Sequence, residues 1–123
     1  MSAWGISDEF IGLVREPILG TILSFQDGIL HQQAEAMGNY LALLVADADL
    51  CSIGSSANIY LEMSRRLIME MAGKTNLSSE EWKNGWAGQV KFQTGRKFLT
   101  IEANTLWGEN LQNNLKTAIK LAK

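Results

Sequence analysis

The chain has 123 residues, of which 46% are hydrophobic and 20% charged, a composition typical of one globular domain rather than of a disordered segment. Its single cysteine excludes an internal disulfide and favours a reducing compartment. The formal net charge of −2 conceals a strong asymmetry. Residues 1–64 hold one basic side chain and eight carboxylates, net −7, whereas residues 65–123 hold ten basic side chains and five carboxylates, net +5. Such asymmetry indicates an anionic partner for the basic half, or association of one half with the other.

The first helix is expected to begin after Ser7, a good N-cap residue, with Asp8 and Glu9 placed favourably for the helix dipole. It should end near Glu16, because a proline at position 17 disfavours helical backbone at the residue before it.

A second helix is expected to begin at Pro17, which suits a first helical turn, and to continue to about Asp49. Either Asp27-Gly28 or Gly38 is a place where it could be interrupted. The spacing of its apolar residues is that of one helical face: Ile18, Ile22, Phe25 and Ile29.

The clearest amphipathic helix follows the turn at residues 52–56 and runs from Tyr60 to Met71, with Gly73 as its C-terminal stop. Ser78 and Glu81 have the spacing of a capping box and predict the start of another helix. A final helix is marked by four apolar positions: Leu111, Leu115, Ala118 and Ala122.

Residues 89–103 have two interpretations. Alternating apolar residues around Thr94-Gly95-Arg96 suit a β-hairpin, but we favour a helix, a loop and a further helix beginning near Phe98. The fold expected is therefore mainly α, a single-domain bundle of about five helices over residues 1–123, with a small β-hairpin near residues 89–103 as the alternative.

No catalytic or cofactor-binding pattern is complete. Gly73-Lys74-Thr75 resembles the end of a phosphate-binding loop but lacks the earlier glycine and the preceding strand. Asp47 and Asp49 could hold Mg²⁺ only with a further ligand, and a polar helix end explains them better. His31 and Cys51, each the only one of its kind, have no spacing that requires a catalytic pair. We predict no enzymatic activity, no cofactor, no metal and no small-molecule substrate.

Two sets of residues are candidates for binding. If the cations of the second half share a face, they would contact nucleic-acid phosphates without reading sequence, although a solvated surface explains each of them singly. The tryptophans at positions 82 and 86 lie on one helix face, as core residues or as interface anchors. The nucleic-acid candidates are Arg65, Arg66, Lys91, Arg96, Lys97, Lys116 and Lys120, and the interface candidates are Trp82 and Trp86.

A small, apparently helical chain with a basic half and no catalytic motif resembles the small subunit of multi-subunit (class 1) CRISPR surveillance complexes. The resemblance covers size and helical pattern, and it assigns no individual residue. It implies a non-catalytic subunit of an RNA-guided antiviral assembly, stacked in several copies and touching DNA or RNA backbone.

Two alternatives stay open. One is a homo-oligomeric helical adaptor with no nucleic-acid role. The other is a roadblock-like α/β dimer module, with strands at residues 40–46 and 90–101. The N-terminus has no basic region before an apolar run, and the longest apolar run, residues 40–46, is too short to span a bilayer. We therefore expect a cytoplasmic protein with protein and nucleic-acid partners and no membrane partner.

Overall fold

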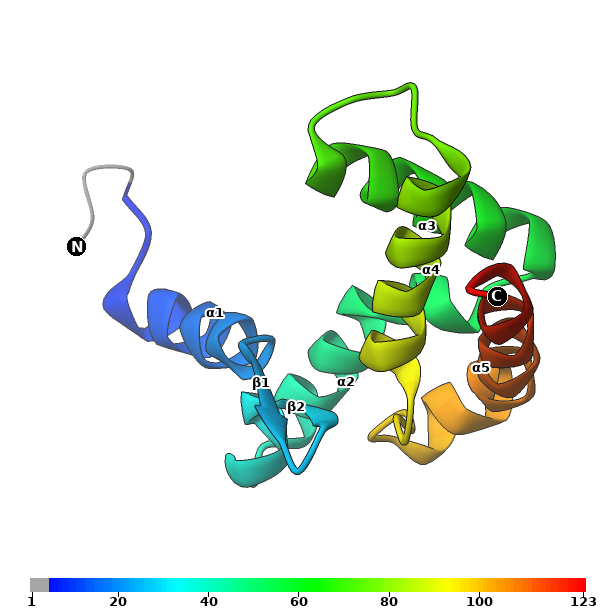
Figure 1. The fold of residues 1–123 in the computed structure, drawn as a ribbon. Helices are drawn as coiled ribbons and strands as arrows, with labels where there is room; N and C mark the ends of the chain where they lie inside the picture. The colour runs from blue at the N-terminus through cyan, green and yellow to red at the C-terminus, as the bar shows by residue number, and fades with distance from the viewer. Residues whose placement is uncertain (1–4) are drawn as a thin grey trace.

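The structure is a computed structural model and describes residues 5–123. Residues 1–4, which belong to the N-terminal segment considered above for a signal peptide, lie outside the described residues. The described chain is mainly helical, as the sequence predicts, with five α-helices, two 3₁₀ helices and one β-hairpin (Figure 1). In chain order these are α1 (Asp8–Gly20), β1 (Leu23–Gln26), β2 (Ile29–Gln32), η1 (Gln33–Ala36), α2 (Tyr40–Asp49), η2 (Cys51–Gly54), α3 (Ala57–Ala72), α4 (Ser79–Gln93) and α5 (Ile101–Leu121).

The predicted end of the first helix at Glu16 is wrong, because α1 continues through Pro17 to Gly20. A proline inside a helix removes one backbone hydrogen bond. Here Pro17 and Gly20 are the two buried residues of α1, and the missing side chain of Gly20 allows close packing. A Cβ on Gly20 would lie 3.1 Å from the Cβ of Ala34 and 3.3 Å from that of Ala42. The packing of α1 against α2 and η1 therefore offsets the missing bond.

The predicted long second helix is also wrong, since residues 23–32 form an antiparallel hairpin in which Leu23 faces Gln32 and Gln26 faces Ile29. The two turn residues both have positive φ, 52° at Asp27 and 77° at Gly28. This is the backbone of a type I′ turn, which Asp-Gly adopts readily and which matches the twist of the two strands. The turn chemistry outweighs the helical spacing of the apolar residues.

Residues 89–103 follow the favoured interpretation: α4 ends at Gln93 and α5 begins at Ile101 after a loop. The hairpin alternative for this segment is wrong. So is the roadblock-like arrangement, because residues 40–49 form α2 rather than a strand. The helix ends agree with their signals: Gly73 is the left-handed C-cap of α3, and Ser78 with Glu81 makes both hydrogen bonds of a capping box.

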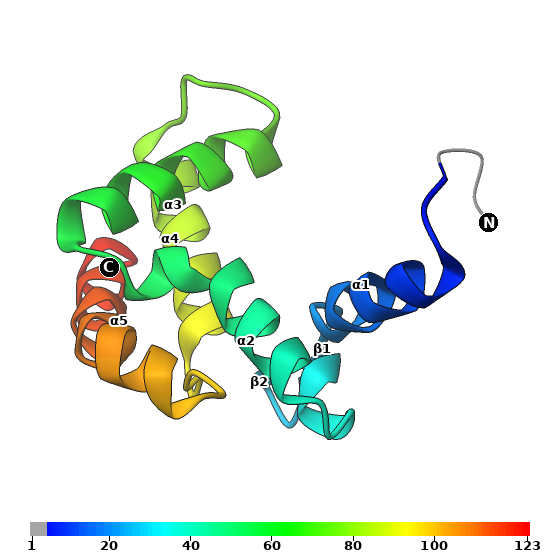
Figure 2. The ribbon, with the colours of Figure 1, turned by 180° about the vertical axis from the view of Figure 1, so that it is seen from behind.

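Large side chains form the core of the C-terminal bundle of α3, α4 and α5. One cluster joins Tyr60, Ile68, Trp86 and Ala118 from the three helices. A second cluster lies under α5 and also takes in Leu30 of the hairpin. Seen from behind, α3 crosses in front of α4, with α5 beside them (Figure 2). The N-terminal part has a much smaller cluster of three alanines: Ala34, Ala42 and Ala46.

A set of buried polar side chains, here called the polar joint, links the N-terminal part to the bundle: Gln32, Asp47, Arg96 and Thr100. The carboxylate of Asp47 accepts hydrogen bonds from Leu99 N at 2.7 Å, Thr100 N at 2.8 Å and Thr100 Oγ1 at 2.7 Å. The guanidinium of Arg96 donates to the Leu30 carbonyl at 3.3 Å and to Gln32 Oε1.

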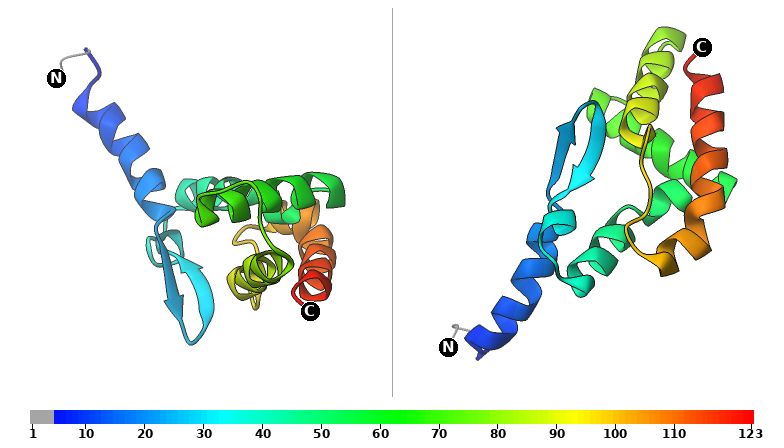
Figure 3. Two further views of the ribbon diagram at one scale, coloured as in Figure 1. Left: turned by 45° about the horizontal axis from the view of Figure 1, so that its top comes forward. Right: turned by 90° about the horizontal axis from the view of Figure 1, so that it is seen from below.

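The molecule is not a closed bundle. The N-terminal turns of α1 extend away from the rest of the chain, and the hairpin forms a second projection beside the end of α4 (Figure 3). Within residues 5–123, no helix is both long and apolar enough to cross a membrane.

Candidate interaction surfaces

One face of α1 is apolar and exposed. We call it the α1 face, and it consists of Phe10, Ile11, Leu13, Val14 and Ile18. Leu13 is 62% exposed and Phe10 55%, although both lie inside a well-formed helix whose first turn is capped by Ser7 Oγ, which accepts from Phe10 N at 3.2 Å. The helix packs on α2 and η1 only through its C-terminal end. The α1 face is therefore presented to solvent on a projecting, ordered element (Figure 3).

A second exposed apolar set runs along α3. We call it the α3 stripe, and its members recur every four residues: Ile59, Met63, Leu67 and Met71. It lies beside the buried face of the same helix, formed by Tyr60, Ser64 and Ile68. Met71 is 79% exposed. The predicted amphipathic face of α3 is thus wider than the surface that α4 and α5 cover.

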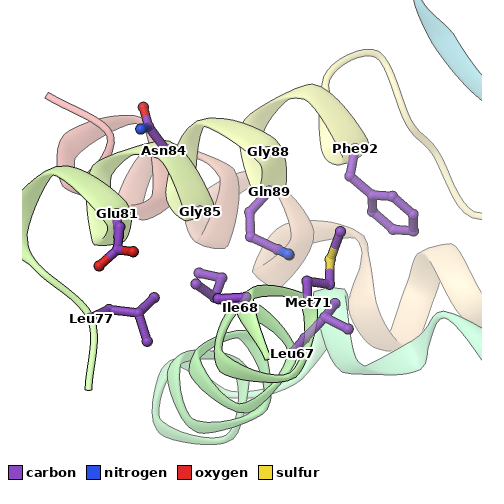
Figure 4. Close-up of a pocket in the computed structure, with 11 residues that line it drawn as sticks. Leu67, Ile68, Met71, Leu77, Glu81, Asn84, Gly85, Gly88, Gln89 and Phe92 are labelled. Carbon is purple, nitrogen blue, oxygen red and sulfur yellow. The ribbon is translucent and has the colours of Figure 1, made fainter. Parts of the chain in front are cut away.

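The α3 stripe borders a groove between α3 and α4, with a cavity volume of about 530 Å³. Leu67, Met71, Leu77 and Phe92 contribute its apolar walls (Figure 4). Gly88 leaves one side open, because a Cβ there would meet nothing within 4 Å. A second hollow of about 470 Å³ continues past Leu67 and Phe92 toward η2. Together they make an elongated depression along α3, apolar between α3 and α4 and with Asp49, Arg66 and Glu70 at its η2 end.

Arg96 is not a surface cation. Its side chain is 3% exposed, and burial lowers the pKa of its guanidinium from the usual value. Its partners are in the hairpin, and its Nε has no hydrogen-bond partner within the described chain. The prediction that Arg96 contributes to a phosphate-binding track is therefore corrected: in this fold the residue belongs to the polar joint.

The other predicted cations are divided between two regions. At the hairpin side, the ammonium of Lys91 lies 5.6 Å from the centre of the Phe25 ring, and Lys97 is exposed in the loop before α5. On α3, Arg66 pairs with Glu62 at 2.5 Å and borders the hollow that Gln89 and Phe92 of α4 also line. The seven candidates do not form one continuous track.

Three further predicted cations are exposed on α3 and α5 of the bundle: Arg65, Lys116 and Lys120. The guanidinium carbon of Arg65 lies 5.6 Å from the centre of the Trp82 ring, and Trp82 packs against the cluster that contains Ala118 of α5. Lys116 and Lys120 are exposed one helical turn apart on α5, on either side of Ala118 in sequence. Lys116 and Lys120 therefore lie on the side of α5 opposite the buried Ala118, whereas Arg65 lies over Trp82.

The two tryptophans differ. Trp86 is buried, and its ring centre lies 6.3 Å from that of Tyr60, so its assignment to an interface is corrected to the core. Trp82 is partly buried beneath Arg65, and its interface role stays a prediction.

Two of the residues considered for catalysis, Asp47 and His31, bond to other groups of the chain. Asp47 is 1% exposed and is occupied by backbone and hydroxyl donors, whereas Asp49 is exposed. His31 Nδ1 lies 2.6 Å from Glu35 Oε2 within one turn of chain. Within residues 5–123 no three His, Cys, Asp or Glu side chains are grouped as metal ligands.

One further pair connects α2 to α5 at the surface. The Tyr40 hydroxyl donates to a carboxylate oxygen of Glu102. This hydrogen bond raises the pKa of the Tyr40 phenol and lowers the pKa of the Glu102 carboxyl. The contact fixes the start of α2 against the start of α5 and leaves the α1 face uncovered.

Neither apolar surface is among the sites that the sequence predicts, although the sequence carries a signal for each. In α1 the apolar positions cover much of the helix circumference, more than one packing contact requires. In α3 a second series spaced by four lies next to the predicted core face. A surplus of apolar faces over available partners marks an interaction surface.

Comparison of the chain with models of protein families, with curated proteins and with solved structures found no match.

Proposed function

We propose that the protein is a non-catalytic subunit that joins a larger assembly through the α1 face. The observation that carries this proposal is an ordered, projecting helix whose large apolar side chains are exposed. Contiguous exposed apolar surface is unfavourable in water and marks a protein or membrane contact. An amphipathic helix commonly binds by laying its apolar face into a groove of a partner protein.

Charge favours a protein partner over a membrane. Helices that bind anionic membrane surfaces carry lysine and arginine on their polar face. On α1 the charged residues are Asp8, Glu9, Arg15 and Glu16, net −2, which an anionic lipid surface would repel. The residue chemistry therefore suits a protein surface that is apolar and electropositive.

The test is association of the purified chain with and without a charge in the α1 face. Light scattering should give a mass above that of one 13.6-kDa chain, and Phe10→Glu should weaken the association about tenfold or more, as expected for an aromatic anchor. Leu106→Glu is the matched control, because Leu106 is 68% exposed on α5. Retained mass in Phe10→Glu, together with unchanged capture of any co-purifying partner, would exclude the α1 face as the contact.

A second function, contact with nucleic-acid backbone inside such an assembly, is favoured by Arg65, Lys116 and Lys120, which are predicted phosphate contacts and are exposed on the bundle. This role agrees with the resemblance to the small subunit of class 1 CRISPR complexes. Binding by the isolated chain should be weak, because the acidic half repels the ligand at long range.

The measurement is fluorescence anisotropy with short DNA and RNA, single- and double-stranded, at several salt concentrations. The triple change Arg65→Ala, Lys116→Ala and Lys120→Ala should weaken binding to every sequence about equally. It should also reduce the salt slope by roughly 0.7 to 0.9 for each phosphate that the protein no longer neutralises. Lys91→Ala with Lys97→Ala, at the hairpin side, is the control. Equal weakening in both variants would mean that only net charge matters.

A further inference from the structure

The α1 face and the depression along α3 are complementary in form. The α1 face is a convex ridge on a single projecting helix, and the depression along α3 is a concave surface between two helices (Figures 3 and 4). In the described structure neither covers the other, since Phe10, Leu67 and Met71 are all exposed.

Their lengths agree. From Asp8 to Ile18 the projecting part of α1 spans ten residue steps, about 15 Å at 1.5 Å per residue. The part of the α3 stripe that lines the two hollows, from Met63 to Met71, spans eight steps, about 12 Å. The projecting part of α1 is therefore long enough to cover this part of the stripe, and Ile59 lies beyond it.

The groove is also suited to a helix by its composition. Methionine side chains are flexible and adapt their shape to a partner, and Met63 and Met71 lie on the open side of α3. On α4, Gly85 and Gly88 line the groove without a side chain that would fill it, and Phe92 points into it (Figure 4).

Charge favours a second copy as the occupant. The half of the chain that contains α1 has a net charge of −7, and the half that begins at Arg65 in the middle of α3 has a net charge of +5. Two copies that approach with α1 of one toward the bundle of the other are therefore attracted at long range. The depression itself is lined by Asp49, Glu70, Glu81 and Arg66, and Lys74 pairs with Glu81 at 2.5 Å. The attraction therefore comes from the charges of the two halves and the binding energy from the apolar surfaces.

Pairing of α1 with α1 of another copy is the less favourable arrangement. It would bring together two acidic halves, and it would leave the α3 stripe and the groove exposed. Insertion of α1 into the groove of the next copy covers both surfaces with one contact. Such a contact joins two different surfaces of the chain, so each copy can bind a further copy and the assembly can grow.

We infer that the α3–α4 groove is the binding site for α1 of a neighbouring copy of the same chain, giving a head-to-tail row of subunits. This inference rests on the proposed role of the α1 face in assembly and adds the identity of the partner surface. The row would have an exposed α1 at one end and an empty groove at the other, where subunits of different sequence could join it.

The test uses two full-length variants, each with one side of the interface disabled. Phe10→Glu with Val14→Glu disables the α1 face, and Leu67→Glu with Met71→Glu disables the groove. All four residues are exposed, so both proteins should fold, which circular dichroism verifies. Each variant alone should be monomeric by light scattering, with association at least about tenfold weaker than in the unchanged chain.

A mixture of the two variants should form a dimer and nothing larger, because one intact α1 and one intact groove remain. Leu106→Glu, mixed with either variant, should still allow longer rows. A mixture that stays monomeric overturns the head-to-tail arrangement. Unchanged association of the groove variant, while the α1 variant is monomeric, would overturn the groove as the site and leave assembly through α1 in place. Met71→Glu alone repeats the comparison if the double variant does not fold.

Discussion

The parts of the chain before and after η2 are held together by different means. The bundle of α3, α4 and α5 buries large side chains such as Tyr60, Trp86 and Leu111, each of which contributes about 1.5–3 kcal/mol or more when removed from water. The part formed by α1, the hairpin and α2 buries three alanines together, and most of its large apolar residues other than Leu30 are exposed. Its position depends on Leu30 and on the polar joint.

This difference in packing assigns stability and binding to different residues. The bundle can provide stability for the whole chain, while the N-terminal part presents apolar surface to another molecule. A protein whose interaction surface also formed its main core would lose fold and binding together. Here the substitutions that test binding, at Phe10 or Met71, lie outside all three core clusters.

The largest expected effect is at the polar joint. Asp47→Ala removes the acceptor of three hydrogen bonds and leaves two backbone N–H groups and one hydroxyl buried without a partner. The cost should be roughly 3 kcal/mol of unfolding free energy, measured by urea denaturation. Asp49→Ala, at an exposed position two residues away, should change stability by less than about 0.5 kcal/mol.

Hydrogen exchange then separates the two parts of the chain. In Asp47→Ala, amides of α1 and α2 should exchange faster, whereas amides of α4 should keep more of their protection. A uniform decrease in protection would show that the two parts unfold as one unit, with no difference in stability between the N-terminal part and the bundle.

An intermediate effect is expected in the bundle, at two glycines of α4 that lie three residues apart. A Cβ on Gly85 would lie 2.4 Å from Cγ2 of Ile68, whereas a Cβ on Gly88 would meet nothing within 4 Å. Gly85→Ala should therefore destabilise the protein by about 1–3 kcal/mol through overpacking. Gly88→Ala should stabilise it by up to about 1 kcal/mol, because alanine is the better helix former. Equal melting temperatures for the two variants would contradict the close contact of α3 and α4.

The smallest effect is expected at the capping box of α4. Ser78→Ala should cost about 1 kcal/mol, because the Glu81 backbone N–H loses its acceptor. Lys74 and the Ser78 backbone N–H lower the pKa of the Glu81 carboxyl from 4.5. A lowered folded-state pKa means that this contribution is present above about pH 4.5 and disappears as the pH falls below it. Thermal melts from pH 6 to pH 3 should show a smaller decrease in Glu81→Gln than in the unchanged chain.

Capping signals predict the helix ends that they mark, whereas the proline signal at position 17 does not, because α1 continues through it. Ser7, Gly73, Ser78 and Glu81 act within one turn of chain, so their effect is visible in a few adjacent residues. The hairpin shows the opposite case: the spacing from Ile18 to Ile29 suits a helix, and Asp27-Gly28 alone indicates the turn. A pair of residues that readily adopts positive φ specifies a turn more strongly than four apolar positions specify a helix.

The binding surfaces are predicted less well, because burial depends on partners far away in sequence. Arg96 stands in a sequence that suits an exposed turn, but the groups that it binds, in Gln32 and Leu30, are 64 and 66 residues earlier. Trp86 meets Tyr60 only through the crossing of α3 and α4. The exposure of Leu67 and Met71 likewise depends on how closely α4 approaches α3, which periodicity does not specify.

The polar joint has a consequence for the order in which the chain acquires its structure. During synthesis, residues 5–50 are complete long before Arg96, Leu99 and Thr100 exist, so the carboxylate of Asp47 and the amide oxygen of Gln32 lack the partners of the finished fold. Contacts across 52 to 66 residues require closure of a long loop, which is slow compared with helix formation. The N-terminal part therefore reaches its final position only after the last third of the chain has been made. Until then its apolar residues are most exposed to premature contacts with other nascent chains.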